Sequence, residues 1–289
     1  YDAKQKDLMR IGVHTLPKFP KDTTDRNRTS PFAFTGNKFE FRMLGSAASI
    51  SCANTVLNTS VAEELKQFAD KLDGAADFET ALHDLIKETI KAHKRIIFNG
   101  DGYDESWVKE AERRGLLNLK TTPDALAHML DEKNVKLFTS HKVLTETELK
   151  ARHEVRLENY CKVSAIEAST LLDMVQRHIL PAASAYADRL TQTAFHKENS
   201  VPALSARMEK TLAQRVTDLG EKLFDTCEAL HAALSDAPAA DGGIDAARYY
   251  RCEIVTRTQK AGELIGRLES LVDAKAWPYP TYADILFSV

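Results

Sequence analysis

The sequence predicts a mainly α protein with a small β contribution. Apolar residues recur every three or four positions through most of the 289 residues, and capping signals flank these stretches. Strand patterns are few and cover only Lys38–Met43, Arg95–Phe98 and Val135–Phe138. The chain is therefore expected to bury helix against helix rather than to build a large sheet.

The first 144 residues are predicted to mix loops, short strands and helices. An apolar stripe over Leu57–Leu72 indicates a helix, and Gly74 follows it as a stop signal. Three further helices are expected to begin at N-caps, which are Asp77, Asp104 and Thr122. The glycine-containing run Asn99–Asp104 is read as a turn because it lacks the further ligands of a calcium loop and the lysine of a phosphate loop.

Residues 145–289 have the pattern of a bundle of long helices. Thr145 and Glu148 form a capping-box pattern, and the helix behind them is expected to run to Leu180, where Pro181 should kink or break it. Further helices are predicted over Ala203–Ser235 and Asp245–Ala274.

Two shorter segments complete this half of the chain. The run of residues 237–243 (APAADGG) is expected to be a flexible spacer. The aromatic, proline-stiffened tail Trp277–Phe287 is predicted to dock on the bundle.

Composition favours a cytoplasmic globular protein. The net charge of −3 gives no support to binding of nucleic acid or a membrane surface, and no apolar run is long enough to span a bilayer. The four cysteines are widely spaced and fall within predicted helices, which favours reduced thiols; they are Cys52, Cys161, Cys227 and Cys252.

The five residues from Lys38 to Arg42 (KFEFR) alternate strictly between charged and aromatic side chains, as in a half-buried strand. On spacing alone, a solvated charged face is the favoured interpretation. The alternative is a metal–phosphate site. In that case Glu40 would be a hard-oxygen ligand for Mg²⁺, and Arg42 and Arg28 would supply guanidinium groups for phosphate oxygens.

The run DRNRTSPFAFTGNKFEFRMLGS (Asp25–Ser46) closely resembles the signature of type III glutamine synthetases. Supporting matches extend along the chain and comprise HKRIIFNGDGY (His93–Tyr103), RGLLNLKTTPDAL (Arg114–Leu126), LENYCK (Leu157–Lys162), ILPAASAY (Ile179–Tyr186) and WPYPTYADILF (Trp277–Phe287). The resemblance covers almost the whole chain and reverses the preference for a plain solvated strand.

The resemblance implies a glutamate–ammonia ligase that makes glutamine from glutamate, ammonia and ATP through γ-glutamyl phosphate. It implies Mg²⁺ or Mn²⁺ as the metal, Glu40 as the metal ligand nearer the nucleotide, Arg28 on the ATP phosphates and Arg42 on the transferring phosphoryl group. Two departures accompany the match. Arg28 lies twelve residues before Glu40, closer than in the commoner bacterial class, and Ala33 stands where that class has a second arginine.

The resemblance also implies a domain division. Residues 1–144 would be the end of an α+β glutamine synthetase catalytic domain, and residues 145–289 a helical extension with a docking tail. The family's paired-glutamate strands, which hold the other metal, and its glycine-rich segment, which binds glutamate, find no match in this sequence. By the resemblance these other walls of the site are expected upstream, and an amphipathic segment is already under way at Ala3–Val13. The isolated chain is then incomplete and inactive alone, and the intact enzyme is a large ring-shaped homo-oligomer. The alternative is a non-catalytic helical module for oligomerisation or interaction.

Overall fold

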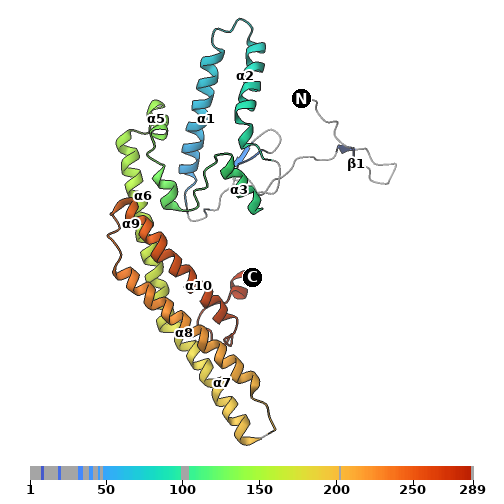
Figure 1. Ribbon diagram of the computed structural model, residues 1–289, viewed down its shortest axis with the longest axis vertical. Coiled ribbons are helices and arrows are strands. Elements are labelled where there is room, and N and C mark those ends of the chain that lie inside the picture. The colour runs from blue at the N-terminus through green and yellow to red at the C-terminus, as the bar shows by residue number, and fades with distance from the viewer. Residues whose placement is uncertain are drawn as a thin grey trace. The chain divides into compact units, whose positions relative to one another are not determined.

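The computed structural model describes residues 8–9, 19–20, 32–34, 39–41, 45, 48–98, 104–201 and 203–287. They belong to two compact units, Tyr1–Asn118 and Leu119–Val289 (Figure 1). The prediction of a mainly α protein with a small β contribution is confirmed. The proposed division of the family's architecture between residues 144 and 145 stays a prediction.

Two short antiparallel hairpins lie in the first unit. Strand β1 (Leu8–Met9) pairs with β2 (Phe19–Pro20), and β3 (Phe32–Phe34) pairs with β4 (Phe39–Phe41). The strand predicted within 38–43 is therefore confirmed over its central three residues. The predicted amphipathic segment at 3–13 lies outside the described residues except for β1.

Helices α1 (Ser51–Leu72) and α2 (Phe78–His93) run side by side in opposite directions (Figure 1). Between them Gly74 has a φ of 75°, a left-handed conformation that glycine adopts without a steric penalty. The side chain of Asp77 accepts a hydrogen bond from the Thr80 amide at 3.3 Å. The predicted stop and the predicted N-cap are both confirmed.

The strand predicted at Arg95–Phe98 is wrong. The last turn of α2 continues into a 3-10 helix, η1 (Lys94–Ile96), and α3 follows at Glu105–Arg113. The Arg114 side chain takes up backbone carbonyl groups of this segment, so they are not available to a β ladder. The predicted N-cap of α3 is confirmed, because the Ser106 amide donates to Asp104 at 2.9 Å.

The second unit begins with two short helices, α4 (Thr122–Ala127) and α5 (Glu132–Ser140). The N-cap of α4 is Thr121 rather than Thr122, since the Thr121 hydroxyl accepts from the Asp124 amide. The strand predicted at Val135–Phe138 is wrong, because these residues lie inside α5. Their two outer apolar residues are three positions apart and also fit one face of a helix, so a four-residue run does not separate the two structures.

The long helices begin at α6 (Glu146–Met174). Its capping box is confirmed: the Thr145 amide donates to the Glu148 carboxylate at 2.7 Å, and the Glu148 amide donates back to the Thr145 hydroxyl at 3.2 Å. The chain does not break at Pro181. It passes through a π-helical turn, η2 (Val175–Ile179), directly into α7 (Leu180–Ser200).

The π-helical turn explains how the helix tolerates this proline. The Leu180 amide donates to the carbonyl of Val175, five residues back, so the hydrogen-bond pattern has already shifted before Pro181. A π-helical turn of this kind re-satisfies backbone groups that a proline would otherwise disrupt.

The bundle is completed by α8 (Arg207–Ser235) and by a last helical segment made of α9 (Gly243–Tyr249), η3 (Tyr250–Val255) and α10 (Thr256–Glu269). This segment ends five residues earlier than predicted. Helix α8 packs against both α7 and α10. The largest fully buried side chains of the core shared by these elements include Leu157, Val175, Leu223, Leu230, Ile254 and Leu268.

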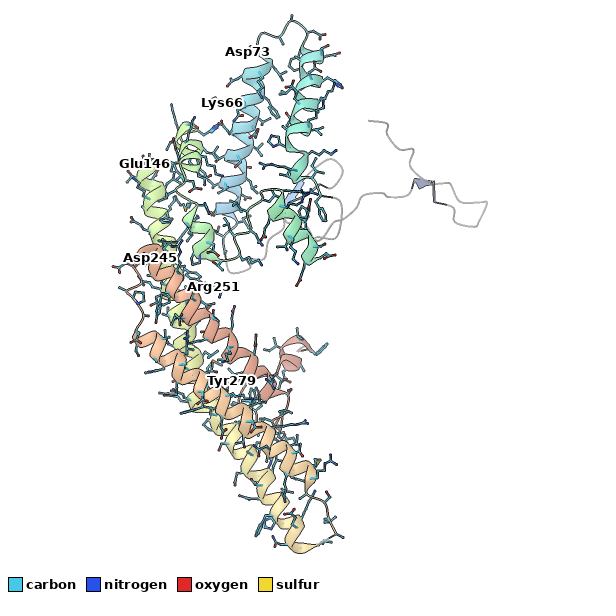
Figure 2. The ribbon with its side chains drawn as sticks, viewed as in Figure 1. Lys66, Asp73, Glu146, Asp245, Arg251 and Tyr279 are labelled. Carbon is cyan, nitrogen blue, oxygen red and sulfur yellow. The ribbon has the colours of Figure 1, made fainter. Side chains whose placement is uncertain are left out.

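The C-terminal tail contacts the bundle through its first residues. Trp277 is 7% exposed. The ring of Tyr279, which is labelled in Figure 2, meets that of His178 edge-on with the centroids 5.8 Å apart. Beyond them, α11 (Tyr282–Phe287) leaves three large apolar side chains exposed, namely Ile285, Leu286 and Phe287.

Two further observations concern the described residues. None of their helices is long and apolar enough to cross a membrane. The thiols of Cys161 and Cys227 are buried, and burial raises the pKa of Cys227 to about 11 and also raises the pKa of Cys161.

Candidate functional site

The candidate metal ligand Glu40 occupies the centre of β4. The β3–β4 ladder pairs Phe32 with Phe41, Ala33 with Glu40, and Phe34 with Phe39. Backbone pairing with β3 therefore fixes the position of Glu40 along the hairpin, and the ladder alternates between phenylalanine pairs and the Ala33–Glu40 pair. This alternation agrees with the pattern from which the strand was predicted.

The other two predicted site residues, Arg28 and Arg42, lie outside the described residues, and so does the side chain of Glu40. The grouping of these three residues around a metal and a phosphate therefore stays a prediction. Within the part of the chain that the structure describes, no three His, Cys, Asp or Glu side chains are placed together to hold a metal ion.

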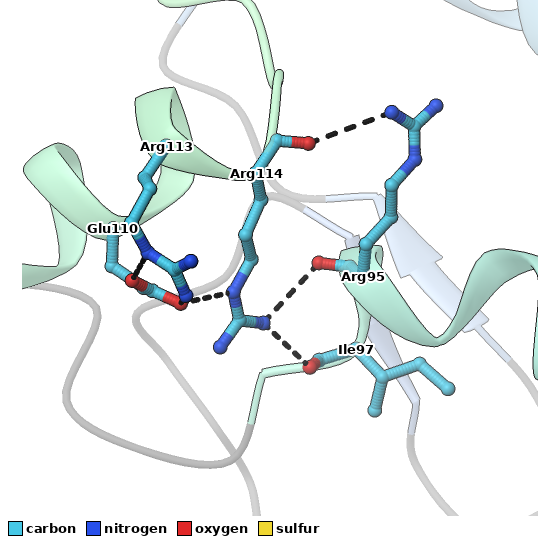
Figure 3. Close-up of polar contacts among 5 residues, drawn as sticks. All are labelled: Arg95, Ile97, Glu110, Arg113 and Arg114. Atoms are coloured by element: carbon cyan, nitrogen blue, oxygen red, sulfur yellow. Dashed lines mark hydrogen bonds and ion pairs between the residues drawn. The ribbon is translucent and has the colours of Figure 1, made fainter.

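A cluster of charged residues links the backbone around η1 to α3 (Figure 3). The Glu110 carboxylate forms ion pairs with the Nε of Arg113 and the Nε of Arg114, each at 2.6 Å. Arg114 also donates through Nη1 to the carbonyl oxygens of Arg95 at 3.2 Å and Ile97 at 3.3 Å. One guanidinium group thus ties a carboxylate of α3 to the backbone that follows α2.

Aromatic contacts reinforce this link. The rings of Phe98 and Trp107 stack with centroids 3.8 Å apart and planes 15° apart. The Arg114 guanidinium lies 5.3 Å from the centroid of the Trp107 ring, within cation–π range. The residues on both sides of the 99–103 segment are therefore held together by stacking, ion pairing and hydrogen bonds.

The electrostatics of this cluster favour the ionised form of the Glu110 carboxylate. The hydrogen bonds from Arg113 and Arg114 lower the pKa of Glu110 to about 2, and the same contact raises the pKa of Arg113. A carboxyl group with a pKa of about 2 has no proton to donate at neutral pH and is a poor general base, so the cluster fits a structural role.

Sequence reasoning did not identify this cluster. Glu110 lies three and four residues before Arg113 and Arg114, a spacing that brings side chains together on a helix and could have indicated the ion pairs. The contacts of Arg114 with Arg95 and Ile97 span nineteen and seventeen residues, so local spacing could not predict them.

In the second unit, a surface hollow of about 370 Å³ lies between α6 and α8. Two of its polar side chains have partners in the protein. Asp173 pairs with Arg177 at 2.8 Å, and the Ser235 hydroxyl donates to the His231 carbonyl at 3.0 Å.

Comparison with known proteins shows what this mainly α chain is similar to. Residues 81–198 match the family of the glutamine synthetase C-terminal domain. Over 99% of its length the chain is 36% identical to the type-3 glutamine synthetase of Dictyostelium discoideum, so the resemblance inferred from its motifs is confirmed.

Bacterial relatives give the same result. The chain is 34% identical to a glutamine synthetase of Bacteroides fragilis over 99% of its length, and 34% identical to one of Butyrivibrio fibrisolvens over 94% of its length. The chain spans about 40% of the length of these relatives: 40%, 40% and 39%. Much of the relatives' sequence thus has no counterpart in these 289 residues.

Proposed function

We propose that this chain works within a type-3 glutamine synthetase, a glutamate–ammonia ligase that uses ATP and forms glutamine through γ-glutamyl phosphate. The observation that carries the proposal is the 36% identity with a type-3 enzyme along 99% of the chain. In this proposal the chain supplies one wall of the active site, and sequence outside the 289 residues supplies the others.

Glu40 is the proposed ligand for Mg²⁺ or Mn²⁺. Its backbone is held in the β3–β4 ladder, and a carboxylate on a paired strand suits a cation that requires hard oxygen ligands in strict geometry. When bound, the metal neutralises charge on the ATP phosphates. A cation of this kind commonly takes one or two carboxylates together with substrate phosphates, so Glu40 needs partners from elsewhere in the enzyme.

Arg28 and Arg42 are the proposed phosphate-binding residues. Arg28 would contact the ATP phosphates, and Arg42 would contact the phosphoryl group during its transfer to glutamate. A guanidinium group is always charged and donates two parallel hydrogen bonds to phosphate oxygens. Donors fixed at the transferring group stabilise the charge that it carries in the transition state.

The proposal extends to the assembly and its location. By resemblance to the family, the intact enzyme is a large ring-shaped homo-oligomer in the cytoplasm. No nucleic acid or membrane partner is proposed, in keeping with the net charge of −3.

Replacement of Glu40 by alanine in the full-length enzyme that carries this chain tests the proposed role. Glutamine synthesis should fall by about a hundredfold or more, because the metal loses a ligand while the strand is preserved. The matched control is Glu167→Ala, an exposed residue of α6, which should retain activity. Gel filtration should show unchanged assembly for both variants, and normal turnover by the Glu40 variant would contradict the assignment.

The alternative function is a non-catalytic helical module, favoured by the long helices α6 to α10. The reading frame upstream of Tyr1 separates the two functions. The enzyme requires continuing sequence with paired-glutamate strands and a glycine-rich segment, whereas a start codon just before Tyr1 would favour the module.

Calorimetry of the isolated chain gives an additional check. We expect Mg-ATP to bind more weakly than about 1 μM, because one carboxylate and two arginines are too few for a preformed site. Sub-micromolar affinity would contradict the view that the other walls of the site lie outside this chain.

A further inference from the structure

The α1–α2 hairpin leaves large apolar side chains in contact with solvent. Within these two helices only Thr59 and Leu85 are buried. Five large side chains are 50% to 61% exposed, and we call them the exposed hairpin residues: Val61, Leu65, Phe78, Ile86 and Ile90.

The exposed hairpin residues recur at the spacing of an apolar helix face that is normally buried by packing. Phe78, Ile86 and Ile90 are spaced in multiples of four along α2, and Val61 and Leu65 are four apart on α1. In the second unit the same kind of spacing, for example that of Leu219 and Leu223 on α8, is buried in the core. Large apolar side chains that recur at helical spacing and remain exposed indicate an interaction site.

The charges of the hairpin exclude two kinds of partner. Each helix carries three acidic and two basic residues, which gives the pair a net charge of −2. A helix that lies on an anionic membrane is rich in lysine and arginine on its polar face, and a nucleic-acid surface is basic. The exposed hairpin residues are therefore suited to contact with another protein surface.

The length of the relatives indicates which surface this is. The chain corresponds to about 40% of the type-3 glutamine synthetase of Dictyostelium, so the other 60% of that enzyme is available to cover the hairpin. We propose that the exposed hairpin residues pack against this remaining part of the type-3 enzyme, within the same polypeptide. The inference rests on the proposed function. It adds that α1 and α2 attach the first unit, which carries the β3–β4 hairpin, to the rest of the enzyme.

Hydrogen–deuterium exchange compares the 289-residue chain alone with the full-length enzyme that carries it. The amides of α1 and α2 should exchange about a hundredfold more slowly in the full-length enzyme, because docking must be undone before these helices open. Amides of α8 around Leu223 serve as the internal control, since this region is already buried in the chain alone. Equal exchange of α1 and α2 in the two proteins would overturn the proposal.

A pair of neighbouring substitutions tests the apolar face itself. In the chain alone, Ile86→Asp and Lys87→Asp should leave the thermal unfolding midpoint equally unchanged, because both side chains are exposed. In the full-length enzyme, Ile86→Asp should restore fast exchange in α1 and α2, whereas Lys87→Asp should not. The same response to both variants would overturn the proposal.

The same experiments also test the alternative that the exposed hairpin residues bind a second copy of this chain. If the α1 and α2 amides of the isolated chain exchange more slowly as its concentration rises, the exposed hairpin residues bind another copy of this chain and the proposal is wrong. These readouts do not depend on catalysis. Docking with no glutamine synthesis would refute only the proposed function, and activity with an unprotected hairpin would refute only this inference.

Discussion

Two adjacent arginines that share one carboxylate differ in how far their side chains are buried. Arg113 and Arg114 both pair with Glu110, yet their side chains are 73% and 26% exposed. Arg114 alone of the two also donates to the backbone of η1 and lies over Trp107. At the scale of residues, the link between η1 and α3 therefore depends on Arg114, and Arg113 adds a surface ion pair of small value.

Truncation of Arg114 should weaken this link. We expect Arg114→Ala to destabilise the α2–α3 region by about 0.5–1.5 kcal/mol, because the carbonyl groups of Arg95 and Ile97 lose their donor. Exchange of the α3 amides measures the effect. Arg113→Ala is the matched control and should change exchange little; equal effects of the two variants would contradict the role given to Arg114.

The low pKa of Glu110 predicts an acid dependence for the same region. Its pKa in the folded chain is about 2, below the ordinary value of 4.5, so folding favours the ionised form. The stabilisation is fully present above pH 4.5 and should be lost as the pH falls from 4.5 towards 2. Trp107 fluorescence in unfolding experiments over this range measures it, with Glu110→Gln for comparison. An unchanged acid dependence in that variant would contradict the prediction.

Helix ends were predictable where a short local interaction determines them. Asp77, Asp104 and Thr145 each cap a helix through an amide two or three residues further along the chain. The apolar runs at 95–98 and 135–138 were misread as strands, because four residues fit either period and their tertiary contacts decide the structure. The π-helical turn before Pro181 was not predictable either, since it depends on how α6 and α7 keep their buried faces in the core.

Two ion pairs join α7 and α8 near the turn between them. In one pair α7 supplies the lysine, and in the other α8 does. Lys197 contacts Glu209, whose side chain is 4% exposed, and Lys210 contacts Glu198, where the two side chains are 57% and 48% exposed. The Lys197 contact lowers the pKa of Glu209, and among the described residues the second oxygen of Glu209 has no hydrogen-bond partner. The buried carboxylate therefore depends on Lys197.

Removal of Lys197 should cost more stability than removal of Lys210. Lys197→Met leaves a buried carboxylate without its cation, whereas Lys210→Met disrupts an exposed pair of little value. We expect Lys197→Met to lower the unfolding midpoint by several degrees and Lys210→Met to shift it by no more than about one degree. Differential scanning calorimetry measures both variants, and equal midpoints would show that Glu209 does not rely on Lys197.

At the scale of the whole molecule, the sequence predicted the mainly α class and the order of the long helices, because amphipathic periodicity is repeated over many turns. The division into units at Asn118 and Leu119 was not predicted. For the candidate site, alternation around Glu40 predicted the strand but left its charged face ambiguous. Only the resemblance of Asp25–Ser46 to a known family assigned chemistry to that face, because ligands from distant sequence leave no local pattern.

The central claim is that Glu40 holds a catalytic metal within the complete enzyme. Titration of the full-length protein with Mn²⁺, followed by electron paramagnetic resonance, tests it directly by counting bound ions per subunit. The account predicts that Glu40→Gln loses one ion per subunit, or binds it at least about tenfold more weakly, while Glu167→Gln binds as the unmodified enzyme does. Unchanged Mn²⁺ stoichiometry and affinity in the Glu40→Gln variant would contradict the account.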